Sequence, residues 1–492
     1  MKSTNFVLTL LLPHLKDVLF TAIFIGAIIT GPRMLNGDLG RHLTMGKYVV
    51  TTFNIPTTDI FSFTKPGESR PPYEWLAQVL FYSIYNILNL DGVVLLTALA
   101  LALTFLWVYI DSIHRSGMPI LAAFLTLWAA SASSIDWLTR PQVFSFLFFA
   151  IWLQGLEKLR NGEKITLWFF PVWMLAWVNT HGGFILGFLA WIAYFAGWIW
   201  EYWRKNEINN IGTKLLIIGI TSGVASIFTP DLWRNWQGVL NNNSIYILSH
   251  TSETMPPDLK IPEYLPFIFL LIFVAILFIL SWKNFPAAHI CLLIGIALIS
   301  LIMARNIPFF AIAAAPILAG NLVTKLRNIS LWSVLEERIL RIDGELRSYY
   351  FLSILIVILS TCSFLYYQIR YHTSFDQFSE QTLPIQAADW LENHPQKGNM
   401  FNDFNWGGYL LFKLWPENKV FIDSQSDFYG EELTRQYAAI LGGEGSWEKT
   451  LSQYGVTWII VPSKSGLAEA ARESANWQIA YQDPLAVILV RK

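Results

Sequence analysis

The stretch GVVLLTALALALTFLWVYIDS, residues 92–112, is apolar over almost its whole length. A helix crosses a hydrocarbon core about 30 Å thick with roughly 20 mostly apolar residues, and this stretch has that length. Comparable runs recur as far as about residue 367. The sequence therefore predicts a polytopic α-helical membrane protein with about 11 spans, at residues 17–34, 92–112, 117–133, 141–157, 165–179, 183–203, 211–228, 263–282, 286–304, 306–324 and 349–368.

The composition agrees with a membrane protein. Of 492 residues, 54% are hydrophobic and only 14% are charged, whereas soluble domains carry roughly 25% charged residues. A water-soluble enzyme of several packed domains is therefore excluded. The formal net charge of −1 gives no reason to expect a nucleic-acid partner, so the function depends on where the charges lie.

The segment EWLAQVLFYSIYNILNL, residues 74–90, decides the topology because counting it as a span inverts every later loop. If this segment lies on the surface or dips in without crossing, the basic short loops fall on the side of Lys2 and Lys16. That side is cytoplasmic by the positive-inside rule. We therefore expect a cytoplasmic N-terminus and an outer first loop, residues 35–91, with juxtamembrane helices. The basic amphipathic stretch 325–348 is expected to rest on the inner leaflet.

The tail has a different pattern. Short apolar runs typical of strands (VFID at 420–423, TWIIVP at 457–462, AVILV at 486–490) alternate with amphipathic helical stretches at 384–394, 431–440 and 467–477. We therefore predict two domains, a transmembrane domain at 1–370 and a small extracytoplasmic α/β soluble domain at 371–492.

The first loop opens with NGDLGRHLTMG, residues 36–46. If 38–50 is a short helix, Asp38, Arg41 and His42 share one face at i, i+3 and i+4. A carboxylate bordered by cations at the mouth of a helix bundle is a candidate general base. The alternative is that Asp38 is a helix N-cap, and capping is compatible with catalysis.

Five further outer residues have two interpretations each. Glu74 follows a Pro-Pro pair, where it is either a second active-site carboxylate or an acid that favours the helix dipole. Arg140 either binds a phosphate, with Asp136 orienting it or another ligand, or reaches to the membrane surface. His181, beside two glycines, is a ligand or phosphate contact or part of a helix C-cap. Arg305 binds phosphate or stabilises a helix end.

In the tail, acids and amides beside aromatic rings suit a carbohydrate acceptor. The candidates for acceptor binding are Asp403, Trp406, Asp423 and Asp427. Turn formation explains most of the same residues, so both interpretations stay open here.

The uncleaved first span, the long outer loop opening with an Asp, and the bundle of about eleven helices followed by an outer domain resemble the GT-C superfamily of membrane glycosyltransferases. This superfamily includes protein mannosyltransferases, aminoarabinose transferases of lipid A and oligosaccharyltransferase catalytic subunits. The resemblance covers 1–325 by layout, with a strict motif match around the first loop. NDFNWGGY (402–409) with VFIDSQSDF (420–428) is loosely similar to the WWDYGY region of oligosaccharyltransferases, without its tryptophan pair.

The resemblance implies an inverting transfer of a sugar from a polyprenyl-phosphate donor to the hydroxyl of a glycan, lipid or protein acceptor at the outer face. Asp38 takes the role of base, and Asp136 or Arg140 supplies another active-site group. Leu39 follows Asp38 where many relatives have a second acid, so we assign no metal ligand and leave a divalent metal open. A transporter or flippase of lipid-linked sugars, and a noncatalytic cell-envelope scaffold, are the alternative functions.

Overall fold

The computed structural model describes residues 9, 12–30, 35–205, 210–240 and 254–492. Each predicted span corresponds to a helix: α2 (Leu15–Ile29), α5 (Trp75–Ser116), α6 (Pro119–Ser133), α7 (Gln142–Arg160), α8 (Phe169–Val178), α9 (Phe184–Lys205), α10 (Ile211–Ala225), α13 (Leu265–Ser281), α14 (Ala287–Ile302), α15 (Ile307–Leu326) and α17 (Phe351–Tyr371). Within the described residues, six helices are long and apolar enough to cross a membrane. The chain is thus a helical multi-pass protein, while the count of about eleven crossings stays a prediction.

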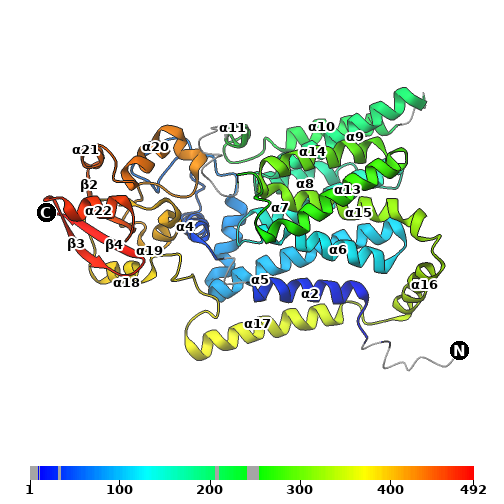
Figure 1. The fold of residues 1–492 in the computed structure, drawn as a ribbon, viewed down its shortest axis with the longest axis horizontal. Helices are drawn as coiled ribbons and strands as arrows, with labels where there is room; N and C mark the ends of the chain where they lie inside the picture. The colour runs from blue at the N-terminus through cyan, green and yellow to red at the C-terminus, as the bar shows by residue number, and fades with distance from the viewer. Residues whose placement is uncertain (1–8, 10–11, 31–34, 206–209, 241–253) are drawn as a thin grey trace.

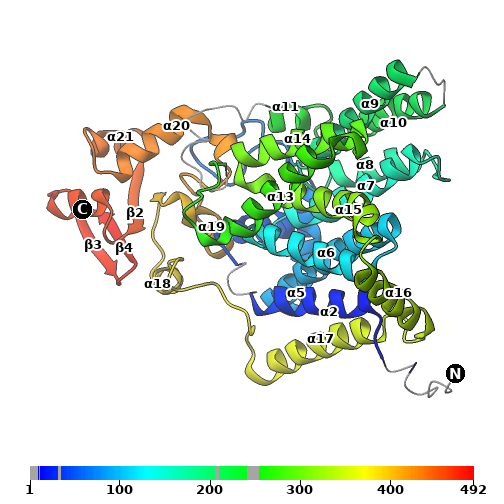
Figure 2. The same cartoon turned by 45° about the vertical axis from the view of Figure 1, so that its right-hand side comes forward.

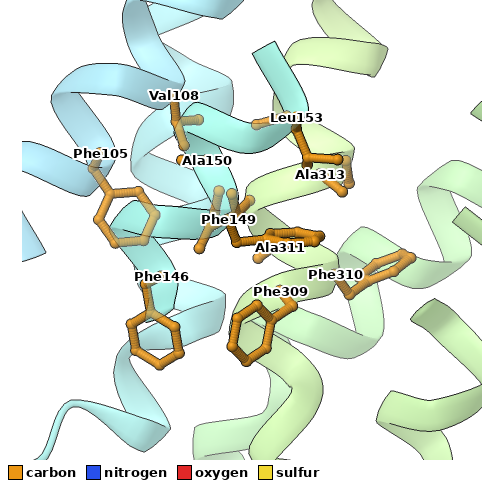
Figure 3. Packing of buried hydrophobic residues seen from close by; sticks show 14 of the residues in the cluster. Phe105, Val108, Phe146, Phe149, Ala150, Leu153, Phe309, Phe310, Ala311 and Ala313 are labelled. Carbon is orange, nitrogen blue, oxygen red and sulfur yellow. The ribbon is translucent and has the colours of Figure 1, made fainter. Parts of the chain in front are cut away.

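The bundle packs through aromatic and small side chains (Figure 3). The ring of Phe309 on α15 contacts those of Phe146 and Phe149 on α7 edge-on, each at a centroid distance of 5.2 Å. The alanines Ala311 and Ala313 on α15 are buried, and small residues let helices approach closely within a membrane. Helix α17 lies beside α2 at the edge of the bundle (Figures 1 and 2).

Helix α5 is broken at Asn89, whose backbone angles (φ 52°, ψ −148°) are not helical. Directly after the break, the carboxylate of Asp91 accepts the backbone N–H groups of Phe375 and Asp376, at 3.0 and 2.7 Å. The segment 75–88 is therefore separate from the span that follows it, as the topology argument requires. Whether this segment lies on the membrane stays a prediction.

Three other α-helices precede the tail within the described residues. Helix α4 (Gly37–Thr52) covers the predicted 38–50, α11 is Arg234–Leu240, and α16 (Ser330–Glu345) is the helix predicted within 325–348. The Glu336 carboxylate of α16 accepts the first free N–H groups of α6, from Ile120 and Leu121. This contact fixes α16 against the bundle.

The tail forms a four-stranded sheet of order β1-β2-β4-β3 at one end of the molecule (Figure 1). Strand β1 (Asn399–Asn402) is parallel to β2 (Val456–Pro462), and β4 (Ala486–Arg491) is antiparallel to both β2 and β3 (Trp477–Gln482). The helices are α18 (Ile385–Asn393), α19 (Gly407–Leu414), α20 (Ser426–Leu441), α21 (Trp447–Gln453) and α22 (Gly466–Glu473). The sequence predicts β2, β4, α18, α20 and α22 correctly.

The prediction of a strand at VFID, 420–423, is wrong. The backbone of Val420 pairs instead with the first loop, donating to the Phe61 carbonyl at 3.1 Å and accepting from Phe63 N–H at 3.2 Å. Side chains of the first loop and the tail also share one hydrophobic core, which includes Leu39 and Tyr409. The division at residue 370/371 therefore stays a prediction.

Glycines allow α4 to lie directly against α19. A Cβ added to Gly40 would lie 2.4 Å from the carbonyl oxygen of Gly408, and one added to Gly408 would lie 2.4 Å from that of Gly37. Real Cβ atoms do not approach backbone so closely, so the two helices touch through bare backbone. The helix that begins with Gly37-Asp38 is thus positioned by the tail.

We expect Gly40→Ala to lower the free energy of unfolding by about 1–3 kcal/mol, because overpacking forces the two backbones apart. Thermal unfolding of the purified protein in detergent measures this loss. The matched control is Gly26→Ala in α2, where an added Cβ meets nothing within 4 Å and stability is expected to rise or stay unchanged. Equal stability of the two variants would contradict the close contact.

Candidate active site

A polar cavity of about 140 Å³ lies where the first loop, the turns between helices and the tail meet. Its lining comes from segments far apart in the chain: Asp38, Arg41, His42, Tyr73, Glu74, Arg140, Pro141, Gln142, His181, Thr254, Arg305, Ser424, Gln425, Ser426 and Asp427. Seven of the eleven residues predicted from the sequence line it: Asp38, His42, Glu74, Arg140, His181, Arg305 and Asp427. The polar cavity thus brings Asp38 together with the basic side chains of distant turns.

Asp38 lies in the first turn of α4, and its Oδ2 is 2.6 Å from Nη2 of Arg140. Its other carboxylate oxygen, Oδ1, is buried and has no hydrogen-bond partner among the described residues. The residue before α4 is Asn36, so Asp38 is not the N-cap. One oxygen is thus held by a cation, and the side chain, 12% exposed, lines the polar cavity.

Glu74 precedes α5 and sits among three nitrogen-bearing side chains. Its carboxylate oxygens lie 3.6 Å from Arg41 Nη2, 3.7 Å from His42 Nδ1 and 3.9 Å from His181 Nε2. Burial raises the pKa of Glu74 to about 7, and Asp427 and Asp38 also raise it, against the opposing effect of Arg41. This carboxyl group therefore changes charge near neutral pH.

His181 lies in the turn between α8 and α9 and is a neutral hydrogen-bond donor toward the cavity. Its Nδ1 accepts the backbone N–H of Gly183 at 3.0 Å and is 2.8 Å from Ser145 Oγ. Because Nδ1 accepts, the proton of the neutral ring is on Nε2, the nitrogen that faces Glu74. Burial and, to a smaller extent, Arg305 lower the pKa of His181 to about 3, so the ring stays uncharged at neutral pH.

Arg305 lies in the one-turn helix η4 (Ala304–Asn306) between α14 and α15. Its backbone carbonyl accepts the side-chain amide of Gln142 at 3.0 Å. Its guanidinium lines the cavity and, within the part of the chain that the structure describes, has no ion-pair or hydrogen-bond partner. An arginine without a partner, facing a cavity, is a ready site for an anion.

A second cavity, of about 510 Å³, adjoins the polar one. Six residues line both: Tyr73, Glu74, Gln142, His181, Arg305 and Asp427. Away from this junction, the lining is mostly apolar and comes from α9, α14 and α15, with Ile185, Leu186, Leu189, Ile299, Ile302 and Phe309. We call this part the apolar groove. It reaches the surface of the bundle at Ile302, whose side chain is 59% exposed.

Four predicted site residues do not line either cavity. Asp136 accepts the amide of Gln142 and so supports the cavity wall. Asp423 is buried against Arg70, 2.8 Å from Nη2. The Asp403 carboxylate accepts the backbone N–H of Asn405 at 2.8 Å, and the Trp406 indole donates to the Thr382 carbonyl at 2.9 Å. The Asp403 contact is local, as the turn interpretation expects, whereas Asp423 and Trp406 make long-range contacts that stabilise the fold.

The sequence did not identify the residues that hold the tail against the cavity. Arg70, in the first loop, donates to Asp59 at 2.6 Å, to Asp423 at 2.8 Å and to Gln425 Oε1 at 2.9 Å. Its guanidinium also lies 4.7 Å from the ring centroid of Phe428. These contacts fix 424–427 as a wall of the polar cavity. A single arginine in a loop gave no spacing pattern from which to predict them.

The described residues contain no group of three or more His, Cys, Asp or Glu side chains placed to hold a metal ion. The cation that pairs with the Asp38 carboxylate is the guanidinium of Arg140. We therefore assign no metal ligands.

No family model and no curated protein matches this sequence. Among solved structures, the apo oligosaccharyltransferase of Archaeoglobus fulgidus matches with a TM-score of 0.56 and 12% identity, covering 91% of this chain and 69% of that one. The same organism's oligosaccharyltransferase AglB, in complex with an inhibitory peptide and a dolichol-phosphate, gives 0.57 and 12%, covering 90% and 69%. A third structure, tethered to an acceptor peptide by a disulfide bond, gives 0.55 and 11%, covering 96% and 74%.

These similarities establish the fold. Over most of its length the chain has the fold of the archaeal oligosaccharyltransferase, so the resemblance expected from the sequence is confirmed at the level of the fold. Together with the apolar helices, this fold makes the chain an integral multi-pass membrane protein.

Proposed function

We propose that this protein is a membrane glycosyltransferase that moves a sugar from a polyprenyl-phosphate donor to an acceptor hydroxyl at the outer face of the membrane. The N-terminus is then cytoplasmic and the tail extracytoplasmic. The observation that carries the proposal is the Arg305 guanidinium, which has no ion-pair or hydrogen-bond partner among the described residues and lies at the junction of the apolar groove and the polar cavity that contains Asp38.

The junction matches the two ends of such a donor. A prenyl chain is apolar, and the groove between α9 and α14 offers it aliphatic side chains such as Leu189 and Ile299. The phosphate is anionic and meets Arg305, with the Nε2–H of His181 as a neutral donor. The sugar then projects into the polar cavity, toward Asp38.

The chemistry is a single displacement with inversion. The Asp38 carboxylate, which lines the polar cavity, takes the proton of the acceptor hydroxyl. The acceptor oxygen forms a bond to the anomeric carbon as the bond from that carbon to the phosphate oxygen breaks, and the lipid phosphate leaves with the electron pair. Arg305 and His181 stabilise the negative charge that builds on the leaving phosphate.

A product assay tests the function. The purified protein in nanodiscs, given radiolabelled prenyl-phosphate sugars and a panel of glycan, lipid and peptide acceptors, is expected to release prenyl phosphate and form a glycoside of inverted configuration. Movement of the labelled lipid across vesicle membranes without any glycoside would instead support a flippase. Neither product nor movement, with tail binding to envelope polymers, would support the scaffold.

A further inference from the structure

Glu74 has no role in the displacement described above, although it is at the centre of the site. It lines both the polar cavity and the apolar groove, together with the phosphate-binding candidates Arg305 and His181. Its carboxylate makes no hydrogen bond with the described residues, since its nearest nitrogen partners are 3.6–3.9 Å away. With its side chain 13% exposed, this carboxylate faces both cavities and can meet a ligand there.

Charge at the junction constrains the state of Glu74. A phosphate on Arg305 would share the junction with the Glu74 carboxyl group, and two like charges at close range in a buried site are strongly unfavourable. A protonated carboxyl group instead has an O–H to donate. The same group is thus repulsive to a phosphate when ionised and a hydrogen-bond donor to it when neutral.

We propose that Glu74 is protonated when the lipid phosphate is bound and donates its O–H to a phosphate oxygen, so that binding takes up one proton from solvent. This inference rests on the proposed function, because it uses the same phosphate position. It gives Glu74 a role in substrate binding, in which the protonation of its carboxyl group changes when the charged ligand binds. It also makes donor and product affinity depend on pH through one residue.

The groups around Glu74 define the pH window. Arg41 and His42 face it from α4, and His181 faces it from the α8–α9 turn. Asp38, Arg140 and Asp427 act on it through their charge. Burial lowers the pKa of His42 well below 6.5, as it does that of His181, whereas burial raises that of Tyr73 well above 10. His42, His181 and Tyr73 therefore all stay uncharged between about pH 6.5 and 8.5.

The direction of the pH effect follows by linkage. The free protein has Glu74 with a pKa of about 7, and a bound phosphate raises that pKa further. Binding is therefore strongest where Glu74 is already protonated, and it weakens as the pH rises through 7. Well above pH 7, the loss approaches roughly tenfold in affinity per pH unit, the limit for uptake of one proton.

The test measures binding of a prenyl phosphate, without sugar, to the wild type and to Glu74→Gln between about pH 6.5 and 8.5. The amide is neutral at every pH, so Glu74→Gln is expected to bind with a much flatter pH dependence and to lose the advantage of low pH. Calorimetry in buffers of different ionisation enthalpy is expected to show uptake of close to one proton by the wild type above pH 7, and almost none by the variant. Glu68→Gln, an exposed acid of the same loop that pairs with Lys65, is the matched control and should behave as the wild type.

The outcomes separate this inference from the proposed function. Binding by both proteins with the same pH slope and the same proton uptake would overturn the role of Glu74 while leaving the lipid-phosphate site intact. Absence of binding to either protein at any pH would overturn the lipid-phosphate site itself, and the inference with it. Comparing prenyl phosphate with inorganic phosphate shows whether the apolar groove contributes to the affinity.

Discussion

Replacement of Asp38 by asparagine is expected to lower the rate of sugar transfer by roughly 10²–10⁴-fold, the usual contribution of a general base. Asparagine keeps the size of the side chain and fills the same place beside Arg140. It cannot accept the proton of the acceptor hydroxyl, so the acceptor is a poorer nucleophile. Donor binding is expected to change little because the phosphate lies at Arg305. Initial rates of product formation and prenyl-phosphate affinity are the two measurements.

The control for this variant is Asp389→Asn, the same change at an exposed carboxylate of the tail that pairs with Lys413. It should leave both the rate and the affinity unchanged. Full transfer activity in Asp38→Asn would remove the assignment of the base. A loss of donor binding equal to the loss of rate would show that Asp38 acts through the donor and not through the acceptor.

Replacement of Arg305 by alanine is expected to weaken prenyl-phosphate binding by about 10–100-fold, because a charged hydrogen bond is worth roughly 1.5–3 kcal/mol. The phosphate then keeps only neutral donors at the junction, His181 and the protonated Glu74. Arg305→Lys should recover part of the affinity, since it restores the charge without the planar fork. Binding curves with prenyl phosphate measure both variants.

Arg234→Ala is the matched control, because Arg234 is half-exposed on α11 and pairs only with the nearby Asp231 in the described residues. Its affinity for prenyl phosphate should equal that of the wild type. If Arg305→Ala binds as tightly as Arg234→Ala, the phosphate lies elsewhere. The proposed donor orientation would then have to be abandoned.

The helices of the bundle were predictable because their signal is local. A run such as 92–112 is apolar whatever it packs against, and a membrane span needs only that length. The face that carries Asp38, Arg41 and His42 followed in the same way from helical spacing. The gathering of Arg140, His181 and Arg305 followed from the topology, which places their turns at the same end of the bundle.

The tail was less predictable because its acids and amides depend on tertiary contacts. An aspartate in a turn has the same sequence pattern whether it faces a cavity, as Asp427 does, or is buried against Arg70, as Asp423 is. The run at 420–423 is apolar enough for a strand, but its backbone pairs with the first loop. The sequence of α4 did indicate a close helix contact, because Gly37 and Gly40 lie one turn apart. That spacing of small residues permits the contact with Gly408 that positions α4.

The sequence also gave no indication of a second buried charge cluster. Arg115 on α5 and His289 on α14 both contact Glu157 of α7, at 3.3 and 2.8 Å, and Arg160 also pairs with Glu157. Glu157, at the centre of this cluster, lies near the end of α7 opposite to Gln142, about 22 Å away at 1.5 Å per residue. It is the other place in the described chain where arginines gather inside the bundle.

The most direct test is the structure of the full-length protein in nanodiscs with a bound prenyl-phosphate sugar. We predict phosphate oxygens within about 3 Å of the Arg305 guanidinium, the prenyl chain along Leu189 and Ile299, and the sugar on the side of Asp38. A phosphate bound near Arg115 and Arg160 instead, at the far end of α7, would contradict the proposed active site.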